Sequence, residues 1–186
     1  MNRYHARTLH RDDFPALMAL EDRLFTSSDD GVLGPYYVRL CCDFFNESCV
    51  VVLDGGEIVG YLLAFVRGRE AYCTTMAVLR EHQGTRALVV LLAAFVEVVI
   101  ERVDSCWFTV EADNRAARSV HAILGAREDR VEPDFYGPGR ARILSRVSRD
   151  GFTRALPRLA RLGIVGATAA SQSPRVTPSI VTEAHA

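Results

Sequence analysis

The chain has 186 residues, of which 49% are hydrophobic, and a formal net charge of −1. This size predicts one domain with a single core. The near-neutral charge provides no field that would recruit nucleic acid or an anionic membrane surface. Five cysteines without C-x-x-C spacing argue against a disulfide framework and against a thiolate zinc site. We therefore expect a cytoplasmic protein with neither nucleic acid nor membrane as a partner.

The first half of the chain predicts one strand, two helices and a three-stranded antiparallel meander. The strand and the helices are predicted at residues 4–10, 11–25 and 34–45, with a turn at 26–31. The meander strands are predicted at residues 50–53, 58–66 and 69–78. Asp54-Gly55-Gly56 joins the first two of these strands and is a strong hairpin signal.

The second half of the chain predicts a long helix, a strand, a shorter helix and two last strands. These elements are predicted at residues 85–102, 106–112, 114–125, 127–131 and 141–147. The composition then changes, which divides the chain into a domain at 1–148 and a C-terminal tail at 149–186. The tail begins with the spacing of a short Arg-rich amphipathic helix that Pro157 weakens, and its last twenty or so residues are predicted to be disordered.

The long helix is apolar nearly all round between residues 87 and 100, where Glu97 is the only charge. This stretch is shorter than the roughly 20 residues that a membrane-spanning helix needs. One apolar face of this helix is enough to cover a sheet. The apolar side chains that lie outside that face are Val89, Val90, Val96 and Ile100. An apolar patch of this kind usually marks a contact. We expect a homodimer to cover it, and the alternative cover is residues 152–164 of the tail folding back.

The segment EADNRAARSVHAILGA at residues 111–126 places Asn114, Ala117, His121 and Gly125 at steps of three, four and four. Asn114 is suited to cap a helix and Gly125 to end it. This register and the order of elements resemble the GNAT superfamily of N-acetyltransferases. The resemblance implies an α/β (α+β) fold with a central mixed, mostly antiparallel sheet of about seven strands, flanked by about four helices.

His121 stands where the superfamily pattern has a tyrosine. The resemblance implies that this side chain lies near the sulfur of acetyl-CoA and protonates the departing thiolate. An imidazole with a pKa of about 6.5 can donate that proton as the cation, or share it through water as the neutral ring. The alternative is a half-buried helix residue without a chemical role. No metal is expected, because His121 has no potential ligand at i+4 or i−4.

A second segment, MAVLREHQGTRAL at residues 76–88, resembles the superfamily's donor-binding strand and its Q/R-x-x-G-x-G/A loop. Gln83 matches the first loop position, but Arg86 and Leu88 stand where the two glycines are expected. Either the Arg86 guanidinium replaces one glycine at the phosphates, or the loop has lost tight binding. The resemblance implies the following acetyl-CoA-binding residues: Met76, Ala77, Val78, Gln83, Gly84, Thr85, Arg86, Ala87, Leu88, Val89 and Asn114.

No carboxylate occupies the two strand positions where many superfamily members carry a glutamate base. Those positions hold Tyr72 and Thr109. Glu111 lies two residues beyond Thr109, on the same face of the strand. The base is therefore predicted to be Glu111 or a water chain that ends at Tyr72. The alternative for Glu111 is a solvated carboxylate at the end of a strand.

The acceptor is expected to be a small amine or amino acid. Residues 42–66 resemble the corresponding region of diaminobutyrate acetyltransferases. In relatives the loop at 134–140 overhangs the acceptor, so Asp134 is predicted to attract an ammonium group and Tyr136 to wall the pocket. The alternative for this loop is a plain glycine-proline turn.

The leading functional hypothesis is acetyl transfer from acetyl-CoA to this amine by direct attack in a ternary complex. Two alternatives stay open. One is a degenerate GNAT fold that serves as a binding module, and the other is an acyltransferase that takes its acyl group from an acyl carrier protein.

Overall fold

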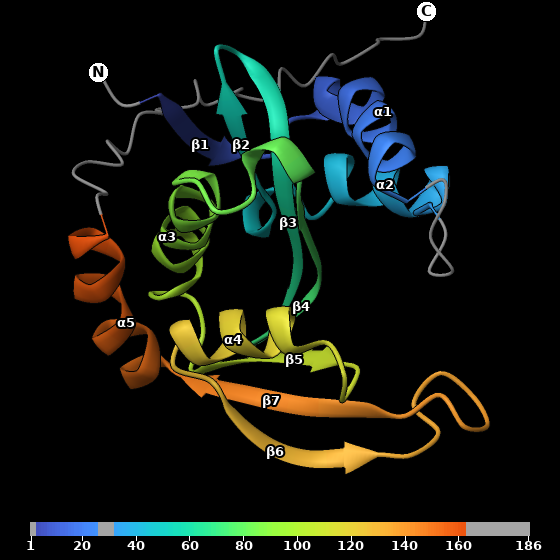
Figure 1. Ribbon diagram of the computed structural model, residues 1–186, viewed down its shortest axis with the longest axis vertical. Helices are drawn as coiled ribbons and strands as arrows, with labels where there is room; N and C mark the ends of the chain where they lie inside the picture. The colour runs from blue at the N-terminus through green and yellow to red at the C-terminus, as the bar shows by residue number, and fades with distance from the viewer. Residues whose placement is uncertain (1–2, 26–31, 163–186) are drawn as a thin grey trace, which may run out of the picture.

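The computed structural model describes residues 3–25 and 32–162, and these form one mixed sheet with helices on both sides (Figure 1). The strands follow the order β1-β2-β3-β4-β5-β7-β6 across the sheet. Their bounds are β1 Tyr4–Thr8, β2 Val50–Asp54, β3 Glu57–Arg67, β4 Glu70–Val78, β5 Ser105–Val110, β6 Arg127–Glu132 and β7 Arg142–Ser148. Neighbouring strands run antiparallel except for the parallel pair β4 and β5. The predicted fold class is confirmed.

Five α-helices are present in the described residues, four in the predicted domain and one where the sequence predicts a short Arg-rich helix at the start of the tail. They are α1 Phe14–Phe25, α2 Pro35–Asp43, α3 Ala87–Val99, α4 Arg115–Ile123 and α5 Arg149–Arg161. Short 3-10 turns lie at residues 11–13, 46–48 and 80–82. The fifth helix, α5, comes from the start of the predicted tail, and it continues through Pro157. None of the helices in the described ranges is long and apolar enough to cross a membrane.

The hairpin between β2 and β3 forms where Asp54-Gly55-Gly56 predicts it. Gly55 and Gly56 have φ values of +59° and +98°. Glycine populates this region of backbone space without the steric penalty of a Cβ atom, and two-residue hairpin turns require it. The predicted turn at 26–31 and the predicted disorder at the end of the tail lie outside the described residues.

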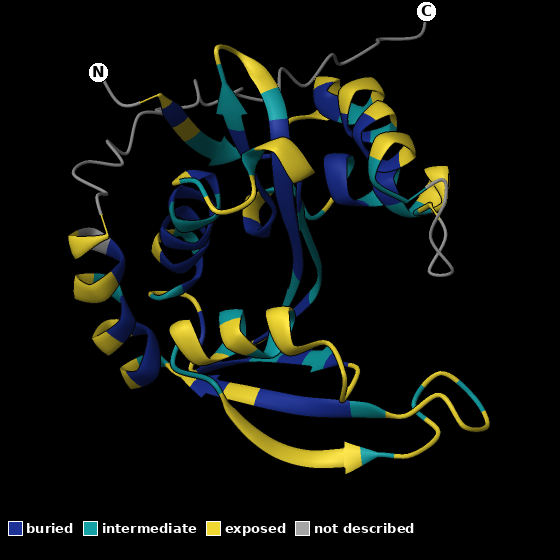
Figure 2. Cartoon of the chain, viewed as in Figure 1, coloured by how far each residue is buried: buried dark blue, intermediate teal, exposed yellow. Residues whose placement is uncertain are grey.

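Helix α3 is buried between the sheet and α5 (Figure 2). Val90 is 7% exposed and Val96 is fully buried, so the expectation that these side chains are left over for a partner is wrong. The α5 residues that become buried are Phe152, Ala155 and Leu159. The rings of Phe152 and Phe95 meet edge to face with centroids 6.2 Å apart.

The tail is therefore the cover that the structure provides for α3. The sequence argument for a homodimer depended on four uncovered apolar residues, of which Val90 and Val96 are buried within the chain and Val89 and Ile100 are half-buried. The homodimer stays a prediction without this support. The division of the chain at residue 148 also stays a prediction, although α5 beyond it packs directly on the core.

Candidate active site

A cavity opens where the two parallel strands part. Strands β4 and β5 are paired only between Glu70–Cys73 and Ser105–Phe108. Beyond this point β4 keeps its pairing with β3 as far as Val78, and β5 keeps its pairing with β7 as far as Val110. The facing edges of β4 and β5 therefore have no strand partner there, and their backbone donors and acceptors remain available. The cavity at this opening has a volume of about 260 Å³.

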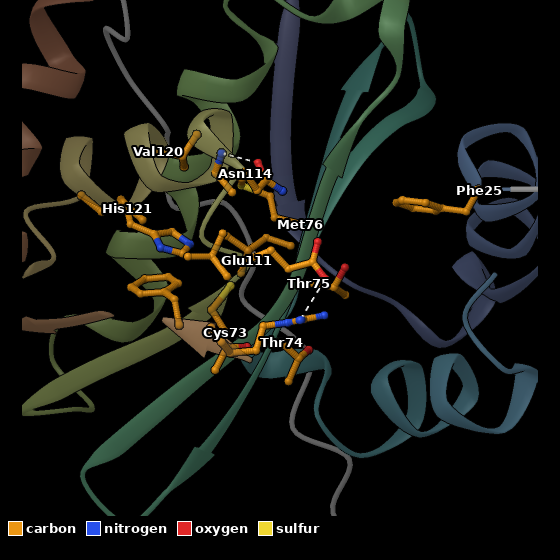
Figure 3. Close-up of a pocket in the computed structure, with 16 residues that line it drawn as sticks. Phe25, Cys73, Thr74, Thr75, Met76, Glu111, Asn114, Val120 and His121 are labelled. Carbon is orange, nitrogen blue, oxygen red and sulfur yellow. Dashed lines mark hydrogen bonds and ion pairs between the residues drawn. The ribbon is translucent and has the colours of Figure 1, made fainter. Parts of the chain in front are cut away.

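Three elements supply most of the cavity wall (Figure 3). Strand β4 contributes residues 73–76, β5 with its following loop contributes 108–111 and Asn114, and α4 contributes one face. Phe25, at the end of α1, approaches from the side opposite His121. The cavity therefore has a helix and two open strand edges around it, together with several polar side chains.

The helix that carries His121 begins and ends where the sequence predicts. Asn114 is the N-cap, and its Oδ1 accepts a hydrogen bond from the backbone N–H of Ala117 at 3.0 Å. At the other end Gly125 has a φ of +84°, and the N–H of Ala126 donates to the carbonyl of His121 at 2.9 Å. This is the hydrogen-bond pattern of a glycine-terminated helix. Both caps fix α4 against the cavity.

His121 lines the cavity and stacks on Phe108, with ring centroids 4.6 Å apart and planes inclined by 27°. Burial lowers the pKa of His121 to about 4, while the charge of Glu128 opposes this shift. The ring is thus neutral at neutral pH. Its Nδ1 atom is buried and has no hydrogen-bond partner in the described residues. A buried polar atom of this kind costs about 1–3 kcal/mol unless a ligand or water satisfies it.

Glu111 lines the cavity in an ion pair with Arg142, the first residue of β7. Arg142 Nη1 lies 2.9 Å from Glu111 Oε1, and the Arg142 side chain is only 11% exposed. The same guanidinium lies 5.0 Å from the ring centroid of Tyr136. Glu111 therefore has a charged partner, although its own side chain is 49% exposed, so the solvated carboxylate stays an alternative. Sequence reasoning missed Arg142, because its contact with Glu111 joins two strands that are far apart in the sequence.

Tyr72 does not line the cavity but is linked to it through a hydroxyl. Its phenol oxygen lies 3.1 Å from Thr109 Oγ1, which lines the cavity, and 3.4 Å from the phenol oxygen of Tyr136. The Tyr72 ring stacks on Trp107 with centroids 4.0 Å apart. Burial raises the pKa of Tyr72 above its usual range. It stays a protonated phenol at neutral pH and can act only as a relay. Thr109 is the residue that connects the Tyr72 hydroxyl with the cavity.

The loop between β6 and β7 is a glycine turn that Asp134 closes. Asp134 Oδ1 accepts a hydrogen bond from the backbone N–H of Gly139 at 2.8 Å. Gly137 and Gly139 have φ values of +111° and +73°. Tyr136, 49% exposed, reaches from this loop towards Tyr72. The structure thus gives Asp134 a turn-closing contact, and its predicted contact with an ammonium group stays a prediction.

The predicted phosphate loop leads from β4 to α3 and does not line the cavity. Thr85 Oγ1 accepts from the N–H of Ala87 at 3.2 Å, and the Arg86 carbonyl accepts from Val90 at 2.9 Å. Since the first four N–H groups of a helix have no intrahelical partner, those of Leu88 and Val89 are left for a bound anion. Gly84 has a φ of +72°. The side chain of Gln83 donates to the Val78 carbonyl at 3.0 Å.

The structure brings only part of the predicted set to one place. Met76, Glu111, Asn114 and His121 share the cavity wall. The predicted residues outside that wall are Tyr72, Ala77, Val78, the loop at 83–89, Asp134 and Tyr136. Within the described ranges there is no group of three or more His, Cys, Asp or Glu side chains that could hold a metal ion.

Comparisons with known proteins agree with this geometry. Residues 9–126 match the model of the acetyltransferase (GNAT) family. A homolog of the ARD1 subunit of the N-terminal acetyltransferase complex, from Dictyostelium discoideum, is 30% identical over 128 residues. That match covers 65% of this chain and 63% of the relative, so the chain spans less than two thirds of the relative's length.

Solved structures show the same fold at low sequence identity. Ard1 from Thermoplasma volcanium superposes with a TM-score of 0.67 at 18% identity, over 79% of this chain and 98% of that one. Diaminobutyrate acetyltransferase from Paenibacillus lautus, solved with its substrate and coenzyme A, gives a TM-score of 0.64 at 20% identity, over 80% and 96%. Several acetyltransferases of different substrates thus share this fold.

Proposed function

Because the chain belongs to the acetyltransferase (GNAT) family, we propose that it transfers an acetyl group from acetyl-CoA to a primary amine, with a small molecule as the acceptor. The observation that carries this proposal is the cavity between the parting strands β4 and β5. There a neutral imidazole and an ion-paired carboxylate share one wall.

The donor's pantetheine arm would lie against the open strand edge. Residues 74–76 of β4 have no partner on the β5 side, so their backbone can hydrogen-bond the amides of the arm as a neighbouring strand would. The unpaired N–H groups of Leu88 and Val89 are suited to the pyrophosphate, because the start of a helix carries a partial positive charge. Acetyl-CoA supplies the thioester that the amine attacks.

His121 would assist the departing sulfur as a neutral ring. With a pKa of about 4, only about one ring in a thousand is protonated at pH 7. Its role is therefore to hold a hydrogen bond at the sulfur and to relay a proton from water. The absence of a partner for its buried Nδ1 in the described residues supports this proposal, because the ring has a nitrogen that no protein group occupies.

Glu111 is the base that the cavity favours. It attracts the acceptor as an ammonium ion and takes its proton before attack, while Arg142 holds the carboxylate in place. The second route runs through Thr109 to Tyr72 and Tyr136, three hydroxyls in sequence. Because the pKa of Tyr72 is raised, this route moves a proton along hydroxyls without a charged tyrosine.

Direct transfer to the amine is favoured over a covalent cysteine route. Cys73 is the cysteine of the cavity wall, and burial raises its pKa to about 12. A thiol with this pKa is protonated at neutral pH, whereas the thiolate is the nucleophile. The acetyl group therefore passes in one step within a ternary complex.

The test measures the rate at which coenzyme A is released from acetyl-CoA when a pool of small amines, or a pool of peptides with free N-termini, is added. Acceleration by small amines supports the proposal. Acceleration by peptides alone favours a second candidate, acetylation of protein N-termini, which the ARD1-like relative brings forward. No acceleration by either pool, together with no acetyl-CoA binding, would leave a binding module or a carrier-protein donor.

Binding of acetyl-CoA can be measured separately by thermal unfolding. A ligand at a hundredfold over its Kd stabilises the folded protein by about 2.7 kcal/mol. The cytoplasmic location and the homodimer remain predictions that these assays do not address.

A further inference from the structure

A second cavity lies where the end of α4 meets the start of α5, and arginines surround it. It has a volume of about 220 Å³. Its lining comprises Gly125, Ala126, Arg127, Gly151, Arg154, Ala155 and Arg158. None of these residues lines the cavity between β4 and β5. The two cavities are therefore separate: α4 lines the first, and the residues that follow α4 line the second.

Two glycines bring the arginines together. A Cβ atom on Gly125 would stand 3.1 Å from the carbonyl oxygen of Gly151, and one on Gly151 would stand 2.6 Å from a methyl carbon of Val147. Because neither glycine has a side chain, α5 sits directly on the end of α4 (Figure 1). Arg127 follows Gly125 by two residues, and Arg154 follows Gly151 by three. The close backbone contact thus fixes the two arginine-bearing segments side by side.

The three guanidinium groups have no counter-charge in the part of the chain that the structure describes. Arg127, Arg154 and Arg158 form no ion pair and no side-chain hydrogen bond there, whereas Arg118, Arg130 and Arg149 each pair with an acidic side chain. The nearby carboxylate of Glu128 is held by Arg118 at 2.7 Å. Asp150 precedes Gly151 but does not line the cavity.

The three arginines are exposed, so solvent screens their mutual repulsion, but no paired carboxylate of the described residues offsets it. Arg154 and Arg158 are four residues apart on α5, where like charges destabilise a helix. The end of α4 offers about half a negative elementary charge from its dipole, which does not balance three full positive charges. Guanidinium groups bind phosphate oxygens through paired, charge-assisted hydrogen bonds.

We propose that Arg127, Arg154 and Arg158 form a binding site for a phosphate-bearing small molecule, separate from the acetyl-donor site. Ala155 and the two glycines line the same cavity and have no long side chain to fill it. The proposal does not depend on the acetyltransferase activity, because no residue of the β4–β5 cavity takes part.

Calorimetric titration of the full chain with inorganic pyrophosphate, at constant ionic strength, tests this site. Wild type is expected to bind it. The double variant Arg154→Gln/Arg158→Gln is expected to bind at least about tenfold more weakly, since it removes two of the three guanidinium groups that would bind the phosphate oxygens. Arg161→Gln is the matched control, because it removes an exposed arginine of the same helix that does not line the cavity.

Arg86→Gln separates this site from the start of α3, the other place where an anion is expected. Retained binding in Arg86→Gln and lost binding in the double variant support the proposal. Loss in Arg86→Gln with full binding in the double variant would place the anion at α3 and overturn it. Absence of binding to wild type would overturn it as well. Thermal unfolding of each variant checks that the exposed substitutions leave the fold intact.

Discussion

The imidazole of His121 lies on the ring of Phe108, and this contact places a titratable helix residue against the middle of strand β5. The stacked position buries the ring and lowers its pKa to about 4, because desolvation disfavours the charged form. One side chain thus connects the stability of the fold with the chemistry of the cavity. Two predictions depend on this single contact.

The first prediction concerns turnover. His121→Phe is expected to lower kcat by roughly 10²-fold while acetyl-CoA affinity stays near wild type, because a positioned proton donor contributes about this much. His121→Tyr is expected to retain substantial activity, since it restores a hydroxyl donor. Because the ring is already neutral, kcat of the wild type should not change with pH near 6.5, and the pH profile of His121→Tyr should match it in that range. Unchanged kcat in His121→Phe, in a chemistry-limited assay, would give His121 a packing role only.

The second prediction concerns stability in acid. The pKa of His121 is about 4 in the folded protein and about 6.5 when unfolded, so the unfolded chain binds the proton more tightly. The contribution of this pKa difference to the free energy of unfolding is fully present above pH 6.5. It is lost as the pH falls from about 6.5 to 4. Allowing for the partial exposure of the ring, the loss is on the order of 2 kcal/mol.

Urea unfolding of wild type and His121→Phe across this pH range measures the effect. The variant keeps the stacking on Phe108 but lacks the titration, so the difference in stability between the two proteins should shift with pH only in that window. His5→Phe, at an exposed position of β1, is the control. A constant difference between wild type and His121→Phe from pH 4 to 7 would contradict the prediction.

The third prediction identifies the base. Glu111→Gln keeps the shape of the side chain but removes the charge, and it is expected to lower kcat by about 10²-fold or more. Tyr72→Phe removes one hydroxyl of the relay and keeps the stacking on Trp107, so it is expected to have a small effect. The opposite order of effects would assign proton transfer to the Thr109–Tyr72 route. Arg142→Gln should raise KM for the amine more than Tyr72→Phe does, because Glu111 loses its fixed position.

The fourth prediction concerns Arg86, which is exposed at the N-cap of α3 and forms no ion pair in the described residues. If its guanidinium reaches the phosphates of the donor, Arg86→Ala weakens acetyl-CoA binding by about 1.5–3 kcal/mol. Acetyl-pantetheine, which lacks the phosphates, should lose far less affinity. Arg80→Ala is the matched control at an exposed, unpaired arginine in the preceding turn. Equal losses with both donors would mean that Arg86 acts on the loop structure.

Local signals in the sequence predicted the elements well. The cap residues Asn114 and Gly125 and the hairpin glycines act within a few residues of themselves, so their effect is readable from the chain. The contacts of Glu111 with Arg142 and of Tyr72 with Tyr136 join segments that are far apart in sequence. They depend on the register of β5 with β7 and on the loop that follows β6. No local pattern specifies them.

The lowered pKa of His121 was unpredictable for a related reason. The spacing of α4 gives the register of the residue, but burial against Phe108 is a tertiary contact between a helix and a strand. The expectation of a cationic donor was one of two options from sequence, and burial favours the neutral ring. The sequence favoured a second subunit over the tail as the contact of α3, because the residues after 166 are small and polar. This composition does not extend to α5, which precedes them and packs well on α3.

The fifth prediction concerns that cover. Phe152 is fully buried and meets Phe95 edge to face, so Phe152→Ala should destabilise the protein by about 3–5 kcal/mol through lost burial and a cavity. Leu162→Ala, at a side chain 56% exposed, is the control and should change little. Urea unfolding measures both.

Removal of α5 tests the same contact against the homodimer. A chain that ends at Ser148 loses Phe152, Ala155 and Leu159 from the outer face of α3, which then exposes apolar surface to water. Such surface promotes association, so light scattering should find the shortened chain more strongly self-associated than the full chain, or insoluble. A full-length dimer that Phe152→Ala leaves intact would mean that a second subunit binds elsewhere. A shortened chain that stays monomeric, soluble and as stable as wild type would show that the sheet side alone holds α3, and the role assigned to α5 would be wrong.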